Sequence, residues 1–121
     1  MRDQKVRAQL IYNAHAGQLD ERRDLERAAR YLEEQGWEVR WRETHGPGDA
    51  TTYAREAAAQ GYAVAIAAGG DGTVGEVAGG LAGSQTALGV LPMGTSNVWA
   101  KEVGIPSAPY LLPPQVRASL G

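Results

Sequence analysis

The sequence lacks cysteine and phenylalanine altogether, and only two of its 12 basic residues are lysine. Without cysteine, a disulfide framework, a thiolate zinc site and a cysteine nucleophile are all excluded. Long hydrophobic runs are absent too, because charged residues or glycines interrupt every candidate before the roughly 18 residues that a membrane-spanning helix needs. The N-terminus carries charges within its first seven positions and lacks the hydrophobic stretch of a signal peptide. We therefore expect a cytoplasmic protein with no transmembrane segment.

The charge of the chain is nearly balanced but unevenly spread. Its 14 acidic and 12 basic residues give a net charge of -2, which argues against a protein that holds nucleic acid by bulk charge. With 121 residues, the chain is long enough for one domain. Twelve of the 16 glycines lie after residue 56, where charges are rare, so we expect that half to be buried and tightly turned. The charged residues there, each of which needs a specific reason, are Asp71, Glu76, Lys101, Glu102 and Arg117.

The hydrophobic pattern predicts four strands, each followed by a helix. The strands are expected at 6–12, 37–42, 63–68 and 87–91, and the helices at 20–35 (with Asp20 as its cap), 49–60, from 73 onward, and as one or two turns at 98–103. The run at 63–68 is continuously apolar, which is typical of a central strand covered on both faces. Gly79 and Gly80 each cost a helix about 1 kcal/mol relative to alanine, so the third helix must be short or closely packed. Alternation of this kind predicts a three-layer α/β/α domain with a parallel sheet.

Four loops rich in glycine, asparagine and threonine follow the predicted strands, at 13–17, 44–48, 69–73 and 92–97. Parallel sheets bind their ligands at the carboxyl ends of the strands, so these loops predict one binding site at one edge of the sheet. His15 and His45 each lie in one of these loops without a carboxylate partner there, which favours loop packing over metal binding.

The segment Gly69-Gly70-Asp71-Gly72-Thr73 carries the strongest signal. Glycines between a buried strand and a helix leave backbone N–H groups free to face an anion, and the helix N-terminus adds partial positive charge. A carboxylate in a phosphate site repels phosphate unless a divalent cation lies between them, or unless Asp71 takes a proton from an attacking hydroxyl. The alternative is structural: the glycines form a tight turn, and Asp71 accepts hydrogen bonds from its amides.

Neighbouring residues add patterns of lower specificity. Thr73 and Glu76 have the spacing of a capping box, so Glu76 either closes the helix start or orients a cation or a nearby side chain. Residues 70–75 match the Gly-x-Gly-x-x-Gly of dinucleotide-binding proteins, but no acidic residue lies between Glu76 and Glu102 to hold the ribose. A P-loop is excluded because the chain contains no Gly-Lys-Ser/Thr.

Two longer segments resemble the diacylglycerol kinase catalytic domain, which bacterial lipid kinases, sphingosine kinases and ceramide kinases share. Residues 69–77 resemble its Gly-Gly-Asp-Gly-Thr signature, with Gly75 where the family usually has asparagine. Residues 91–106 resemble its second block, with Val98 where many members have aspartate. ATP–NAD kinases share the first motif and the superfamily fold but not the second block in this form.

Two shorter motifs occur in the same order as in that family. Residues 13–17 resemble its Asn-Pro-x-x-Gly loop, with Ala14 in place of proline, and Thr44 followed by residues 48–50 resembles its Thr-then-Gly-Asp-Ala segment. Together, the four motifs cover residues 6–106 and are far more specific than any one of them.

The resemblance implies a domain of the diacylglycerol kinase and NAD kinase type that binds ATP with Mg²⁺ and serves transfer of the γ-phosphoryl group to a lipid hydroxyl such as that of diacylglycerol. It implies a catalytic role for Asp71, which would also be the residue that meets Mg²⁺. The positions that it implies for nucleotide binding are Asn13, Ala14, His15, Ala16, Gly17, Thr44, Gly70, Asp71, Gly72, Thr73, Val74, Gly75, Glu76, Gly94, Thr95 and Asn97.

Family members continue into a second, mostly β domain that contacts the lipid. We therefore expect residues 1–106 to form the nucleotide-binding domain and residues 107–121, which contain three prolines, to be a tail at the start of that second domain. The chain alone is then expected to be inactive, and the full-length protein to touch the membrane peripherally. Oligomeric state stays open. The alternatives are a nucleotide-binding module without catalysis and a kinase of another small molecule such as NAD.

Overall fold

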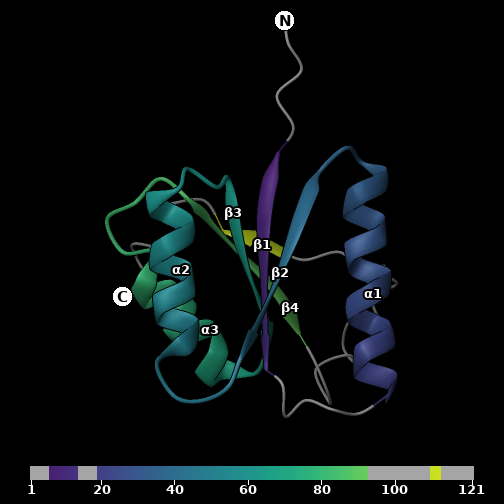
Figure 1. The fold of residues 1–121 in the computed structure, drawn as a ribbon, viewed down its shortest axis with the longest axis horizontal. Coiled ribbons are helices and arrows are strands. Elements are labelled where there is room, and N and C mark those ends of the chain that lie inside the picture. The colour runs from purple at the N-terminus through teal and green to yellow at the C-terminus, as the bar shows by residue number, and fades with distance from the viewer. Residues whose placement is uncertain (1–5, 14–18, 93–109, 113–121) are drawn as a thin grey trace, which may run out of the picture.

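The computed structural model describes residues 6–13, 19–92 and 110–112. Its elements in chain order are β1 (Arg7–Asn13), α1 (Leu19–Glu34), β2 (Glu38–Thr44), α2 (Asp49–Ala59), β3 (Val64–Gly69), α3 (Asp71–Gly80), β4 (Ala87–Pro92) and β5 (Tyr110–Leu112). The sheet has the order β2-β1-β3-β4-β5, and its first four strands are parallel. Helix α1 covers one face, whereas α2 and α3 cover the other (Figure 1). The predicted α/β/α architecture is confirmed.

The core lies on both faces of β1 and β3, because successive strand residues point to opposite sides of the sheet. Leu10 and Ile66 pack with the apolar stripe of α1, and Ile11 packs on the opposite face with α2 and α3. All five residues 64–68 are buried, and β3 pairs with a strand on each side. The prediction that this run forms a central strand is therefore confirmed.

Glycines end the first two helices, as the sequence predicts. Gly36 follows α1 with φ 92°, and the N–H of Trp37 returns to the carbonyl of Leu32 at 3.0 Å. Gly61 follows α2 with φ 79°, and the N–H of Tyr62 returns to the carbonyl of Ala57 at 3.0 Å. In each case a left-handed residue lets the chain reverse and satisfy the last carbonyl groups of the helix.

For three segments, the structure does not match, or does not test, the elements expected from the sequence. Helix α1 already begins at Leu19, so Asp20 is a helical residue and the prediction that it caps the helix is wrong. Residues 110–112, which belong to the tail expected at 107–121, pair antiparallel with β4 as β5. The helix expected at 98–103 lies outside the described residues.

Helices α2 and α3 pack closely because α3 ends in glycine. A Cβ on Gly80 would overlap the carbonyl oxygen of Thr51 and lie 2.8 Å from Cβ of Ala54, whereas a Cβ on the exposed Gly79 would meet nothing within 4 Å. The structure thus explains one of the two unfavourable helix glycines by close packing.

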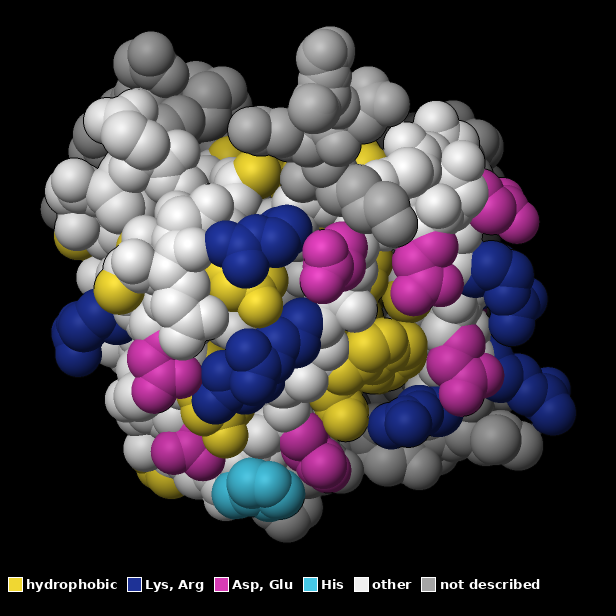
Figure 2. Space-filling model, turned by 45° about the horizontal axis from the view of Figure 1, so that its top comes forward, with side chains coloured by type: hydrophobic (Ala, Val, Ile, Leu, Met, Phe, Trp, Pro, Cys, Tyr) yellow, Lys and Arg dark blue, Asp and Glu magenta, His cyan; other side chains and the backbone are white. Residues whose placement is uncertain are grey.

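The surface agrees with the balanced composition. On the face shown in Figure 2, acidic and basic side chains intermingle with small hydrophobic areas. Within the described residues, the structure contains no helix with the length and hydrophobicity that a bilayer crossing requires.

Candidate functional site

The carboxyl ends of β1 and β2 and the start of α3 surround a cavity of about 410 Å³. Its lining comes from four elements and the loop between β2 and α2, and comprises Asn13, Thr44, His45, Gly46, Pro47, Ala50, Gly72, Thr73 and Glu76. Five of these are nucleotide-binding positions implied by the family resemblance: Asn13, Thr44, Gly72, Thr73 and Glu76. Parallel strands place these residues together although up to 63 positions separate them in the sequence.

The turn into α3 uses its three glycines in different ways. Gly69 has φ 159°, and a Cβ there would lie 2.8 Å from Oγ1 of Thr73, so this glycine is required by the turn itself. Gly70 and Gly72 do not have positive φ, and a Cβ on either would meet nothing within 4 Å. The backbone conformation therefore requires glycine at neither position, and an added Cβ would touch no other part of the described protein. Gly72, which lines the cavity, leaves open space at its rim.

The start of α3 brings backbone N–H groups to the wall of the cavity, since Gly72 and Thr73 belong to its lining. Gly70 precedes the helix, and its carbonyl accepts the first helical hydrogen bond, from the N–H of Val74 at 3.1 Å. The N–H groups of Asp71, Gly72 and Thr73 have no acceptor within the helix, as at the start of any helix. Free donors of this kind, together with the helix dipole, favour an anion.

Asp71 extends into solvent at this helix start. Within the part of the chain that the structure describes, no hydrogen bond joins its carboxylate to the turn amides, so the structural alternative for Asp71 gains no support. In the same described ranges, no three His, Asp or Glu side chains gather to hold a metal ion. His45 lines the cavity but belongs to no such group.

Glu76 has a role that its sequence spacing does not indicate. The residue before α3 is Gly70, which makes Thr73 the third residue of the helix, so the capping-box alternative is wrong. The carboxylate oxygens of Glu76 instead accept the N–H of Gly48 at 3.2 and 3.3 Å, and its carbonyl accepts the hydroxyl of Thr51 at 2.9 Å. Glu76 therefore ties α3 to the loop that forms the opposite wall of the cavity.

Asp49, which no sequence pattern indicated as a site residue, holds the same loop from within. Its Oδ2 accepts the N–H of His45 at 2.8 Å and the N–H of Gly46 at 3.2 Å. With the N–H of Gly48 bound to Glu76, three loop amides are occupied by carboxylates. Among the described residues, an anion therefore finds unpaired amides at the start of α3 but none of these three on the loop side.

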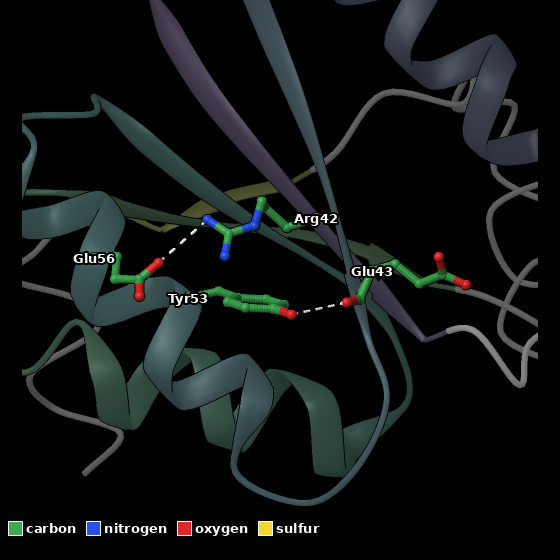
Figure 3. Close-up of polar contacts among 4 residues, drawn as sticks. All are labelled: Arg42, Glu43, Tyr53 and Glu56. Atoms are coloured by element: carbon green, nitrogen blue, oxygen red, sulfur yellow. Dashed lines mark hydrogen bonds and ion pairs between the residues drawn. The ribbon is translucent and has the colours of Figure 1, made fainter.

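The strand that leads into this loop is clamped to α2 (Figure 3). The hydroxyl of Tyr53 donates to the carbonyl of Glu43 at 3.0 Å, and the guanidinium of Arg42 lies 3.9 Å from the centre of the Tyr53 ring. Arg42 also pairs with Glu56 of α2 at 3.2 Å. These contacts hold the end of β2 in place, where Thr44 and the following His45 line the cavity.

Two further predicted site residues belong to α3. Val74 packs its side chain against the core under α3, and Gly75 is exposed, with open space where a Cβ would lie. Seven predicted positions fall outside the described residues, namely Ala14, His15, Ala16, Gly17, Gly94, Thr95 and Asn97.

Comparison with known proteins points to one family. The model of the diacylglycerol kinase catalytic domain matches residues 7–118. A diacylglycerol kinase of Bacillus subtilis is 42% identical over 102 residues, covering 83% of this chain and 34% of that protein, and one of Staphylococcus aureus is 43% identical over 105 residues, covering 85% and 33%. The crystal structure of a diacylglycerol kinase from Bacillus anthracis matches with a TM-score of 0.66 and 33% identity, covering 87% of this chain and 39% of that chain. The chain spans about a third of the length of the curated relatives that it matches.

Proposed function

Because the chain belongs to the diacylglycerol kinase catalytic domain family, we propose that it forms the ATP-binding part of an ATP-dependent lipid kinase. The chain spans about a third of its relatives, so nucleotide binding is what we propose for the chain itself. The reaction that this binding serves is transfer of the γ-phosphoryl group of ATP to a lipid hydroxyl of the diacylglycerol type. We further propose that the protein is cytoplasmic and that a lipid acceptor would bring it to the membrane surface.

The observation that carries the proposal is the open space over Gly72, which lines the cavity, and over the nearby Gly70. Neither glycine is needed for the backbone conformation or for packing, whereas both leave room for a ligand to approach the free amides of α3. A polyphosphate matches this combination of open space and unpaired N–H donors.

Each wall of the cavity then has a distinct role. The amides at 71–73 would hold phosphate oxygens, and the polar side chains of Asn13 and Thr44 would meet the rest of the nucleotide. Asp49 and Glu76 would act as positioning residues, since both hold the loop of the opposite wall in place. The predicted positions 14–17, Gly94, Thr95 and Asn97, which lie outside the described residues, are proposed to complete the site on the strength of the resemblance alone.

Asp71 fits a magnesium ion that arrives with the nucleotide. Mg²⁺ in kinase sites is held by one or two carboxylates together with phosphate oxygens, and Asp71 offers one exposed carboxylate at the helix start where phosphate would bind. The ion would neutralise charge on the transferred phosphoryl group. We expect Asp71→Asn to keep the fold and to remove the Mg²⁺ dependence of ATP binding, as measured by titration calorimetry with and without Mg²⁺.

The decisive experiment compares two glycine-to-alanine changes in the same helix. Gly72 and Gly79 are both exposed, and an added Cβ meets nothing within 4 Å at either position, but only Gly72 lines the cavity. Calorimetric titration with Mg·ATP should show affinity at least about tenfold weaker for Gly72→Ala, which corresponds to roughly 1.4 kcal/mol. Gly79→Ala should bind like the parent chain. Equal affinity of the two variants would refute nucleotide binding at the start of α3.

A transfer assay separates a lipid kinase domain from a binding module. With radiolabelled ATP and either diacylglycerol or sphingosine, we expect the chain alone to bind nucleotide but to transfer little phosphate. Phosphoryl transfer depends on positioning the acceptor, which can account for about 7–11 kcal/mol of the barrier. Phosphorylation of NAD rather than of lipid would favour the small-molecule kinase alternative.

A further inference from the structure

Thr44 lies at the point where a strand becomes the loop of the cavity wall. It is the last residue of β2, it lines the cavity, and only 7% of its surface is exposed. Its partner across the sheet is Asn13, and the pairing of β2 with β1 ends at this pair. The direction of the Thr44 side chain therefore depends on how the two peptide groups that flank it are held.

Both of these peptide groups are bound by side chains of α2. Peptide groups are planar, so the rotation of the two groups next to a residue, its φ and ψ, sets the direction of its side chain. The group before Thr44 carries the carbonyl of Glu43, which accepts the hydroxyl of Tyr53 at 3.0 Å (Figure 3). The group after Thr44 carries the N–H of His45, which donates to Oδ2 of Asp49 at 2.8 Å. The backbone is thus held on both sides of Thr44.

Asp49 and Tyr53 can act together because they are four residues apart on the same helix. Residues at this spacing share one face of a helix, and helical side chains lean toward the helix N-terminus. The N-terminus of α2 is where the loop at 45–48 joins the helix. A single face of α2 therefore reaches both peptide groups.

The ring of Tyr53 is itself held in place. The guanidinium of Arg42 lies 3.9 Å from its centre and pairs with Glu56 of α2 at 3.2 Å (Figure 3). A cation over an aromatic face is favourable, and the half-buried ring also packs against the core between α2 and the sheet. The hydroxyl of Tyr53 consequently stays close to the carbonyl of Glu43.

We propose that Tyr53 is a positioning residue of the nucleotide site, which together with Asp49 fixes the backbone of Thr44 and so holds its side chain at the cavity wall. The inference rests on the proposed function, in which Thr44 meets the nucleotide. A ligand binds less tightly when the competent conformation of its site is populated only part of the time. Tyr53 touches no part of the nucleotide in this account and acts through Thr44.

Removal of one hydroxyl tests the first step. Tyr53→Phe keeps the ring beside Arg42 and removes only the donor to Glu43. Tyr62→Phe is a matched control, because Arg7 likewise lies 4.4 Å from the centre of its ring, but Tyr62 precedes β3 at the end of the sheet away from the cavity. Calorimetric titration with Mg·ATP should show affinity about threefold to tenfold weaker for Tyr53→Phe, the range that one hydrogen bond contributes. Tyr62→Phe should bind like the parent chain.

A double-mutant cycle with Thr44→Val separates positioning from general stabilisation. Two residues that act through one contact have non-additive effects. Thr44→Val removes the hydroxyl that we expect to meet the nucleotide and keeps the branched shape of the side chain. In this background, Tyr53→Phe should change the affinity by less than about twofold. The full loss in both backgrounds would overturn the claim that Tyr53 acts through Thr44.

The outcomes distinguish this inference from the proposed function. A parent chain that binds no Mg·ATP would overturn both, whereas equally tight binding by the parent chain and Tyr53→Phe would overturn the role of Tyr53 alone. If Thr44→Val fails to fold, amide hydrogen exchange at His45 decides. It should be faster in Tyr53→Phe than in Tyr62→Phe, because the loop then opens more often, and equal rates would contradict the proposal.

Discussion

Replacing Gly80 by alanine should destabilise the protein, although alanine is the better helix former. Gly80 is the last residue of α3 and is buried against α2. A Cβ there would overlap the carbonyl oxygen of Thr51 and lie 2.8 Å from Cβ of Ala54 and 3.1 Å from the N–H nitrogen of Arg55. Two of these three atoms belong to the backbone of α2, so no side-chain rotation relieves the contact and the helices must move apart.

Two opposing terms determine the size of the effect. Alanine in place of glycine stabilises a helix interior by about 1 kcal/mol. Overpacking costs about 1–3 kcal/mol, and we expect the upper part of that range because the obstacle is backbone. Gly79→Ala shares the favourable term without the contact, since its Cβ would meet nothing within 4 Å. The two variants should therefore differ by about 2–3 kcal/mol in free energy of unfolding, with Gly80→Ala the less stable.

Thermal and urea denaturation of both variants measure this difference. At about 4 °C per kcal/mol for a domain of this size, Gly80→Ala should melt roughly 8–12 °C below Gly79→Ala. Because the same shift of α3 would draw Glu76 away from Gly48, ATP affinity should also fall in Gly80→Ala alone. If Gly80→Ala is as stable as Gly79→Ala, the reasoning from close helix packing is wrong.

Three further changes test other parts of the structure. Gln9→Met should raise the free energy of unfolding by about 1–3 kcal/mol in urea denaturation, because Gln9 is fully buried and neither amide atom has a hydrogen-bond partner among the described residues; a loss of stability would show that the amide is satisfied. Gly69→Ala should cost about 1–3 kcal/mol in the same assay, whereas Gly70→Ala, with open space at its Cβ, should cost a few tenths. Glu76→Ala should weaken ATP binding by releasing the N–H of Gly48, and Glu76→Gln, which keeps an acceptor oxygen, should restore most of the affinity; equal loss in both would show that the charge of Glu76 matters instead.

Much of the architecture was predictable because it depends on local patterns. The apolar run at 63–68 is short and lacks polar interruptions, and such a segment is stable only with both faces covered. Gly36 and Gly61 end helices because glycine alone adopts their φ without steric cost. These properties depend on a residue and its sequence neighbours, so the α/β/α class was correctly predicted. A cavity lies at the edge of the sheet where the sequence predicts a binding site.

The predictions that were wrong concern partners distant in sequence or a choice between neighbouring residues of one type. The spacing of Thr73 and Glu76 favours a capping box, but a carboxylate takes whichever N–H the fold brings near, and here that is Gly48, 28 positions away. Within the glycine cluster, composition could not distinguish Gly69, which the turn requires, from Gly70, which leaves open space.

The packing of α3 on α2 shows most clearly what the sequence determines and what only the tertiary structure decides. The sequence alone shows Gly79 and Gly80 as two equally unfavourable helix residues. In the structure, the first faces solvent and the second meets the backbone of α2 at Thr51. Local sequence determines which backbone conformations are favourable, and hence the order and class of the elements. Which atoms meet across two elements depends on how those elements pack together, and only the tertiary structure decides that.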